Sequence, residues 1–280
     1  MLKKAIFSLF LLTQAPHIAH ATLVEEKTEA TSKVDALKEE FRGFQIDLPS
    51  YYRYTEPNLM SLRGINYRAG VEYTFFLTES SRWLMHIDYS FAYAKLDYKS
   101  FGTGSLDNQK NTIHELKVNV GKAAIFLGHP FKYYWGLGYR LLNHDGRGVS
   151  TTGHNGYRRK SQYFTFTGGY DWVLALSSNW DFKLKNEISL MPLGIQKSYL
   201  GDVDTSNDNV TNIQSFGVNF RLNPTFVLSK HFVVGPYIDL WYIAESDKVR
   251  FYDTDSSSYG YLYEPENNTV EFGLTVGARF

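Results

Sequence analysis

The chain has 280 residues, 29 basic and 29 acidic side chains, and no cysteine. The balanced charge gives no support for nucleic-acid binding, and the lack of cysteine excludes a disulfide scaffold and thiolate chemistry. Aromatic residues are unusually abundant at 16%, with 21 tyrosines and 20 phenylalanines. The fold must therefore accommodate many bulky aromatic rings.

The N-terminus has the pattern of a secretory signal peptide. Lys3 and Lys4 precede the apolar run 5–12, and the small-x-small triplet 19–21 follows it. This order predicts an exported protein that is cleaved after residue 21, so that 1–21 is a signal peptide; a buried N-terminal helix is the alternative. Residues 22–42 are charged and lack strand character, so we expect a periplasmic N-terminal segment there.

From about residue 43 to the end, apolar and polar residues alternate in segments separated by turn residues. In 65–77 every second residue is apolar, while the residues between them up to 74 are polar or small. The same period-two pattern recurs at 83–93, 131–141, 164–174, 216–226 and 270–280. Strict alternation over such lengths predicts β-strands with one apolar face.

The connections between these segments come in two sizes that alternate. Short turns are expected near 78–81, 129–130, 177–179 and 229–231. Long polar loops are expected at 99–112, 143–160, 197–212 and 246–268. Short turns on one side and long loops on the other are typical of a membrane barrel, with turns in the periplasm and loops outside the cell.

The connections divide residues 64–280 into nine strands, whereas a single-chain bacterial barrel has an even number. The apolar residues between 44 and 54 supply a tenth strand, although Pro49 is unusual in a strand that pairs on both sides. The sequence therefore predicts an all-β fold: an antiparallel up-and-down transmembrane β-barrel over 43–280, with ten strands. Eight and twelve strands are the alternatives.

The last strand carries the most specific signal. Its apolar face ends on a terminal aromatic residue and consists of Phe272, Leu274, Val276, Ala278 and Phe280. With the features above, this strand makes residues 43–280 resemble a Gram-negative outer-membrane β-barrel protein, without indicating a subfamily. The resemblance implies export to the outer membrane, contact with its lipid, and recognition of that terminal face by the barrel-assembly machinery.

A soluble β-sandwich or lipocalin-like barrel would turn these apolar faces inward. They hold more aromatic rings than a small interior can contain, which disfavours that reading. Lys122 and Asn186 are the misfits, because both fall on apolar faces. A bulge near Gly121 would turn Lys122 inward.

The alternation sends charges of both signs to the inner face. The expected positive residues are Arg53, Arg68, Lys117, Lys132, Arg140, Lys183, Lys185, Arg221 and Arg279. The expected negative residues are Asp47, Glu72, Asp88, Glu115, Asp171, Asp181, Glu187, Asp239 and Glu271. Since open aqueous channels need about sixteen strands, balanced charges predict a lumen that is mostly plugged, with at most a narrow passage.

Turn lengths fix which inward residues face each other across a hairpin. Three-residue turns at 177–179 and 229–231 give two facing pairs, and a two-residue turn at 129–130 gives a third unless a bulge near residue 122 shifts it. The predicted pairs are Asp171 with Lys185, Arg221 with Asp239, and Glu115 with His144. Facing opposite charges stabilise a sheet by roughly 0.2–1 kcal/mol.

Two functions of different classes fit this pattern. The first is a non-enzymatic surface protein, either structural or ligand-binding, or a narrow porin-like channel. The second is a barrel-embedded hydrolase similar to omptins, which have acidic residues and a His-Asp couple at the outer mouth. The candidates for such a site are Glu115, His144, Asp145, Asp202 and Asp204. We find no omptin motif, so we expect no catalytic residues and no enzymatic activity.

The loops give weaker indications. The segment 202–208 lacks the glycine and glutamate of a calcium loop, so we expect neither a metal nor a cofactor. The 143–160 loop is basic, with Arg158, Arg159 and Lys160, whereas the 246–268 loop carries Glu264 and Glu266 beside several tyrosines. Tyrosine-rich loops can bind partners through rigid rings, so an extracellular ligand is expected at the loops.

Overall fold

The computed structural model describes residues 43–279 except 79–81, 178, 205–206, 230 and 254–257. The expectations for the signal peptide, for segment 22–42 and for Phe280 concern residues outside this set. The strands are β1 (Gly43–Glu56), β2 (Met60–Phe76), β3 (Trp83–Ser100), β4 (Gly104–Phe126), β5 (His129–Val149), β6 (Asn155–Ala175), β7 (Trp180–Ser198), β8 (Val210–Gln214), β9 (Gly217–Leu228), β10 (Phe232–Ile243), β11 (Val249–Asp253), β12 (Ser258–Leu262) and β13 (Asn267–Arg279).

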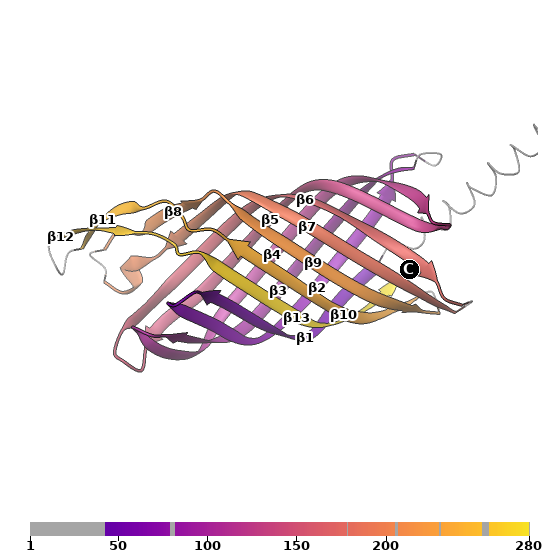
Figure 1. Ribbon diagram of the computed structural model, residues 1–280. Helices are drawn as coiled ribbons and strands as arrows, with labels where there is room; N and C mark the ends of the chain where they lie inside the picture. The colour runs from indigo at the N-terminus through magenta and orange to yellow at the C-terminus, as the bar shows by residue number, and fades with distance from the viewer. Residues whose placement is uncertain are drawn as a thin grey trace, which may run out of the picture.

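Ten of these strands form one closed antiparallel barrel (Figure 1). Strands β1 to β7 are neighbours in chain order, β9, β10 and β13 complete the ring, and β13 pairs with β1. Strand β8 pairs with the outer part of β7, while β11 and β12 form a separate hairpin at the end opposite the C-terminus. The predicted all-β barrel of ten strands is confirmed.

The strands extend further at one end than the sequence predicts. Only residues 101–103 join β3 to β4 and only 150–154 join β5 to β6, so most of the predicted loops 99–112 and 143–160 is paired strand. The loop 197–212 contains the 3-10 helix η1 (Leu200–Asp202) and the start of β8, and 246–268 contains the β11–β12 hairpin. Longer pairing satisfies backbone groups that a polar loop would leave to water. Within the described part of the chain, no helix is long and apolar enough to cross a membrane.

The outside of the barrel is covered by exposed apolar side chains. Tyr67, Leu137 and Phe166 are each more than half exposed, and Phe272 and Leu274 of β13 also point outward. Such an apolar band is expected where the barrel contacts the hydrocarbon of a membrane. A closed ring of strands suits these surroundings, because it leaves no backbone edge unpaired in lipid. Exposed rings gather at the short-turn end, as in an aromatic girdle; they include Trp83, Phe126, Trp180, Phe226 and Phe232.

Lys122 lies in this girdle and not in the lumen. It faces Trp83 and Tyr133 in ladders that have no bulge near Gly121, so the predicted inward turn there is wrong. Its Nζ atom lies 5.6 Å from the centre of the Trp83 ring. A long cationic side chain can reach the interface this way while its stem stays in apolar surroundings.

Strand β1 contains a bulge at Leu48–Pro49. Residues up to Asp47 pair in one register, and a register shifted by one begins at Ser50 against β2 and at Tyr51 against β13. A bulge is where a strand tolerates a proline, since no ladder hydrogen bond is required there. The shift turns Tyr52 into the lumen and exposes Arg53, so the predicted inward position of Arg53 is wrong.

The β4–β5 hairpin turns two residues earlier than predicted. Leu127 and Gly128 form the turn with φ of 52° and 78°, and Phe126 pairs with His129. Two left-handed residues match the twist of the flanking strands, which explains why the chain turns there and not at residues 129–130.

This shift changes the partners along the hairpin. Glu115 faces Arg140 and His144 faces Asn111, so the predicted Glu115–His144 pair is wrong. The other two hairpins have the predicted register, because their turns span the expected number of residues. They place Asp171 opposite Lys185 and Arg221 opposite Asp239.

Candidate functional site

The lumen is filled by charged side chains across its middle. Arg68 of β2 binds Glu271 of β13 at 2.7 Å, and Lys185 of β7 binds Glu72 of β2 at the same distance. Lys117 of β4 also forms an ion pair with Glu187 of β7. All three contacts join strands that are not neighbours in the sheet, and the last two join strands three or more places apart, so they bridge the lumen from wall to wall.

The predicted facing pairs are part of this network but are not its shortest contacts. Asp171 binds Lys132 at 3.0 Å and Lys183 at 3.1 Å, while Lys185, its register partner, binds Glu72. Arg221 lies 4.0 Å from Asp239 and 3.5 Å from Asp47. In a narrow lumen, long side chains reach past their register partners to other strands.

One cluster within this layer has the spacing of a metal site. Donor atoms of Glu72, His86 and Asp88 lie within 4.8 Å of one another. The Lys185 ammonium lies 2.7 Å from Glu72 and 3.4 Å from Asp88. His86 contacts Thr74 through Nδ1 at 2.9 Å. The ammonium thus neutralises the carboxylates that a metal ion would need.

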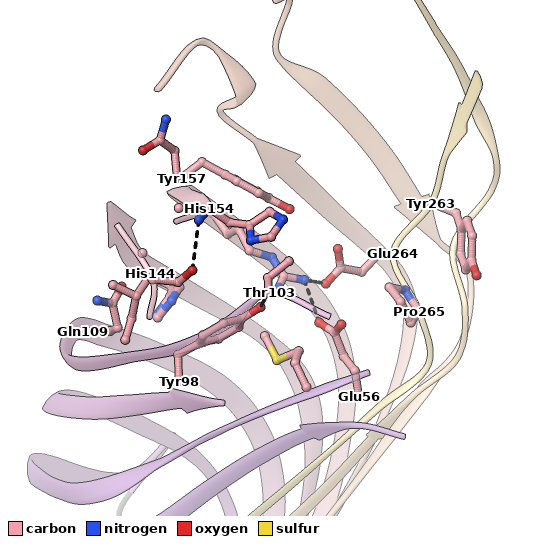
Figure 2. A pocket seen from close by; sticks show the side chains of 17 residues that line it. Glu56, Tyr98, Thr103, Gln109, His144, His154, Tyr157, Tyr263, Glu264 and Pro265 are labelled. Atoms are coloured by element: carbon pink, nitrogen blue, oxygen red, sulfur yellow. Dashed lines mark hydrogen bonds and ion pairs between the residues drawn. The ribbon is translucent and has the colours of Figure 1, made fainter. Parts of the chain in front are cut away.

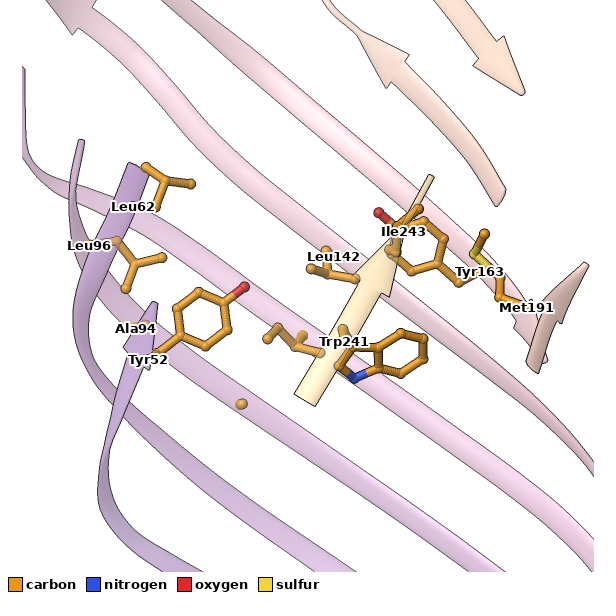
Figure 3. Close-up of a cluster of buried hydrophobic side chains, with 11 residues drawn as sticks. Tyr52, Leu62, Ala94, Leu96, Leu142, Tyr163, Met191, Trp241 and Ile243 are labelled. Carbon is orange, nitrogen blue, oxygen red and sulfur yellow. The ribbon is translucent and has the colours of Figure 1, made fainter. Parts of the chain in front are cut away.

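Apolar layers lie on both sides of the charged layer. At the short-turn end, Leu84, Ala123 and Val173 form a small buried cluster. Toward the other end lies a larger one, drawn in Figure 3, which we call the inner apolar layer. It consists of Tyr52, Leu62, Ala92, Ala94, Leu96, Ile113, Leu142, Tyr163, Met191, Trp241 and Ile243.

Above the inner apolar layer the barrel opens into a cup of about 370 Å³ (Figure 2). Arg159 of β6 binds Glu56 of β1 at 3.0 Å and also forms an ion pair with Glu264, which precedes β13. The hydroxyl of Tyr54 donates to Glu56 at 2.9 Å and lies 3.4 Å from Glu264. One guanidinium therefore joins three segments that are distant in sequence.

The cup also presents polar groups without a protein partner. His144 lines it, and the Nδ1 atom of that ring has no hydrogen-bond partner among the described residues. A smaller cavity below holds the Asn111 side chain, whose Nδ2 atom is likewise unpartnered within the described chain. Buried polar groups normally have partners, so these atoms could bind a ligand's polar group or water.

Comparisons with known proteins agree with this architecture. No family model and no curated protein matches the chain. Among solved structures, the outer membrane protease OmpT from Escherichia coli is similar with a TM-score of 0.54 and 9% identity, covering 87% of this chain and 97% of that one. The chain folds as an outer-membrane β-barrel.

Two autotransporter barrels are also similar. The β domain of the Bordetella autotransporter BrkA has a TM-score of 0.40 and 14% identity, with 85% of this chain and 100% of that one covered. The transport unit of AIDA-I from Escherichia coli has a TM-score of 0.41 and 13% identity, with 87% and 91% covered.

The outer-membrane barrel does not bring the five hydrolase candidates together. Glu115 lies buried in the charged layer, 2.9 Å from Lys117. Asp145 and Asp202 bind Arg147 and Arg158, each at 2.8 Å, and hydrogen bonds from Arg158 lower the pKa of Asp202. His144 alone lines the cup, opposite Arg159 in the β5–β6 ladder. The fifth candidate, Asp204, is absent from the residues that line the cup.

Sequence reasoning missed the residues that build the cup of this outer-membrane barrel. The sequence indicates no role for Glu56 and predicts that Arg159 and Glu264 lie in two separate loops. The opposite signs of those loops were the available signal, because charges of opposite sign at one end of a barrel can pair across the mouth. The inner apolar layer was also missed.

Proposed function

We propose that this chain is a non-enzymatic, non-conducting outer-membrane barrel that binds an extracellular ligand in the cup. The observation that carries the proposal is the stacked filling of the lumen: the inner apolar layer lies above a charged layer whose members bridge the barrel. An ion would have to break wall-to-wall ion pairs and cross the inner apolar layer to pass. This argues against the narrow-channel alternative.

The cup supports a binding role more than hydrolysis. A base that activates water needs a carboxylate or similar acceptor to orient it. His144 has a guanidinium as its register neighbour, and Glu56 and Glu264 are both engaged by Arg159. One guanidinium offsets only one of the two carboxylates, so these three groups leave a net negative charge and the cup suits a polar ligand that is not anionic. The Tyr98 and Tyr157 rings in its lining could stack on such a ligand.

Planar-bilayer recordings test the closed lumen. The refolded protein should show no discrete opening events, since every layer of the lumen is occupied. Because the natural chain has no cysteine, a Val149→Cys variant labelled with a fluorophore allows inserted molecules to be counted; Val149 is 65% exposed. Stepwise conductance proportional to the number of inserted molecules would refute the non-conducting barrel.

A hydrolysis screen with peptide and phospholipid substrates tests the second candidate. We expect no turnover above that of the double variant His144→Ala with His154→Ala, which lacks both histidines that line the described cup. Turnover by the natural chain that this double variant abolishes, with the fold intact by circular dichroism, would favour the hydrolase and contradict the binding role.

A further inference from the structure

The β11–β12 hairpin projects beyond the barrel at the end opposite the C-terminus (Figure 1). Within the part of the chain that the structure describes, its two strands pair only with each other. Hydrogen bonds to β8 hold its base. The Asn212 side chain donates to the backbone carbonyls of Asp247 and Leu262, each at 3.1 Å, and the Ile213 amide donates to the Asp247 carboxylate at 2.7 Å. The hairpin is therefore anchored at its base and open to solvent above it.

One face of this hairpin consists of tyrosines and cations. The register pairs Arg250 with Tyr261 and Tyr252 with Tyr259, and these four side chains share a face because side chains alternate along a strand. One more residue of each strand continues the same face toward the base. The four tyrosines are each between 43% and 69% exposed. We call the following residues the tyrosine face: Lys248, Arg250, Tyr252, Tyr259, Tyr261 and Tyr263.

Both cations of the tyrosine face lean from β11 across to β12. The guanidinium carbon of Arg250 lies 3.8 Å from the centre of the Tyr259 ring, and the Lys248 ammonium lies 5.2 Å from the centre of the Tyr263 ring. Among the described residues, no carboxylate lies within ion-pair distance of Arg250. The positive charge thus lies over the tyrosines of β12.

Acidic residues close to the hairpin do not neutralise this charge. Asp247 and Asp253 occupy positions on the opposite face, because they alternate with the cations along β11. Glu264 belongs to the cup, where it forms an ion pair with a guanidinium. Glu245 lies 3.9 Å from Lys248, but both side chains are about half exposed or more, and such surface pairs are weak. The tyrosine face therefore keeps a net positive charge.

Strand β12 is an edge without the usual protection. Natural edge strands are commonly blocked by lysine, proline or a bulge, because an open edge is a template for another strand. The five residues of β12 read SYGYL, with no charge and no proline, and they pair with β11 without a bulge. Residues 258–261 are all exposed. An approaching strand would thus meet neither a charge of β12 nor a covering segment among the described residues.

We propose that an extended acidic segment of another protein binds outside the cell as a strand added to β12. Its alternate carboxylates would lie over the tyrosine face and pair with Arg250 and Lys248. Main-chain hydrogen bonds supply affinity in such strand addition, and alternate side chains supply specificity. Tyrosine and arginine are also enriched at protein interfaces. A second copy of the hairpin fits less well, because it would bring the same two cations to the edge. This inference is independent of the cup.

The test measures binding of synthetic fluorescent peptides to the refolded protein in uncharged detergent micelles by fluorescence anisotropy. A peptide that alternates glutamate with threonine should bind, and its affinity should fall with added salt. A peptide that alternates lysine with threonine should bind at least about tenfold more weakly, because its charges oppose those of the tyrosine face.

Backbone methylation tests strand addition itself. Successive amides of a strand point to opposite edges, so methylating the nitrogens of only the glutamates or only the threonines blocks one edge each. One of these two peptides should bind at least about tenfold more weakly than the other, since it loses the ladder hydrogen bonds to β12. Equal affinities of the two methylated peptides would overturn the added strand. Polygalacturonate, an anionic polymer without a peptide backbone, would overturn the polypeptide as partner if it bound as tightly as the acidic peptide.

A charge reversal tests the role of the two cations. The double variant Lys248→Glu with Arg250→Glu should prefer the lysine peptide over the glutamate peptide, a gain of binding that a misfolded variant would not show. The matched control, Lys95→Glu with Lys99→Glu, makes the same change of charge at exposed positions near the outer end of β3. It should keep the affinity for the acidic peptide within about twofold, since charges far from the hairpin are screened.

Two outcomes of these variants would contradict the proposal. Equal losses of acidic-peptide binding in the two double variants would mean that overall charge, and not the tyrosine face, attracts the peptide. Self-association of the natural chain that the hairpin double variant alters, without binding of any peptide, would assign β12 to a second copy of this chain. None of the four substituted residues lines the cup, so these results do not depend on a ligand there.

Discussion

Replacing Arg68 with methionine should lower the free energy of unfolding by about 3–5 kcal/mol, the loss expected when one partner of a buried ion pair is removed. The guanidinium lies 2.7 Å from Glu271, 3.6 Å from Glu115 and 3.7 Å from Asp47. Within the described chain no other cation lies within ion-pair distance of Glu271. Its remaining partners include the neutral donors Asn66 and Tyr237.

Urea unfolding of the refolded barrel, followed by tryptophan fluorescence, measures this loss. Adding Glu271→Gln to Arg68→Met should recover part of the stability, because the buried charge of Glu271, which has lost its cationic partner, is then removed. Arg63→Gln is the matched control on the same strand: its side chain points outward, so it should change the stability by less than about 1 kcal/mol. A loss for Arg68→Met no larger than that of Arg63→Gln would contradict the buried network.

Truncating Trp241 to alanine should cost about 3–5 kcal/mol, the range for a large aromatic residue in a packed core. Trp241 is 4% exposed and belongs to the inner apolar layer. Its ring stacks on Tyr163 with 6.2 Å between ring centres and lies 4.4 Å from the Arg140 guanidinium carbon. The cavity left by the change is enclosed by other side chains and cannot collapse freely.

Trp135→Ala is the matched control, because it removes the same side chain from the outer face. Trp135 is 46% exposed, and lipid or detergent can fill the space that its ring leaves. Its loss should therefore be well below that of Trp241→Ala in the same urea titration. Equal losses would mean that the inner apolar layer does not act as a packed core.

The sequence was sufficient to predict the barrel because alternation is a local property of each strand. Tyr67 and Leu137 could be assigned to the lipid side by their spacing alone. The inner apolar layer could not be found this way: Leu62, Ile113 and Leu142 occupy inward positions beyond the lipid band, where the two faces no longer differ clearly in polarity.

The strand register and the composition of the cup depend on information that the alternation of apolar and polar residues does not contain. Moving one turn from residues 129–130 to 127–128 changes every facing pair in its hairpin, and local composition allowed either turn. The contact between Arg159 and Glu56 joins β6 to β1, strands that face each other only because the ring is closed. Knowing the strands therefore does not reveal the cup.

The bulge at Leu48–Pro49 has an effect at the far end of its strand. One extra residue there reverses the orientation of everything that follows in β1, so Glu56 points to the mouth interior and Arg53 to the outside. At about 3.3 Å per residue, the bulge and Glu56 are separated by roughly 23 Å. Deleting a single residue at the bulge would turn the Glu56 carboxylate, which binds Arg159, to the outside of the barrel. The same deletion would point Arg53 into the barrel. The side chains that line the cup are thus set by a length difference near the opposite rim.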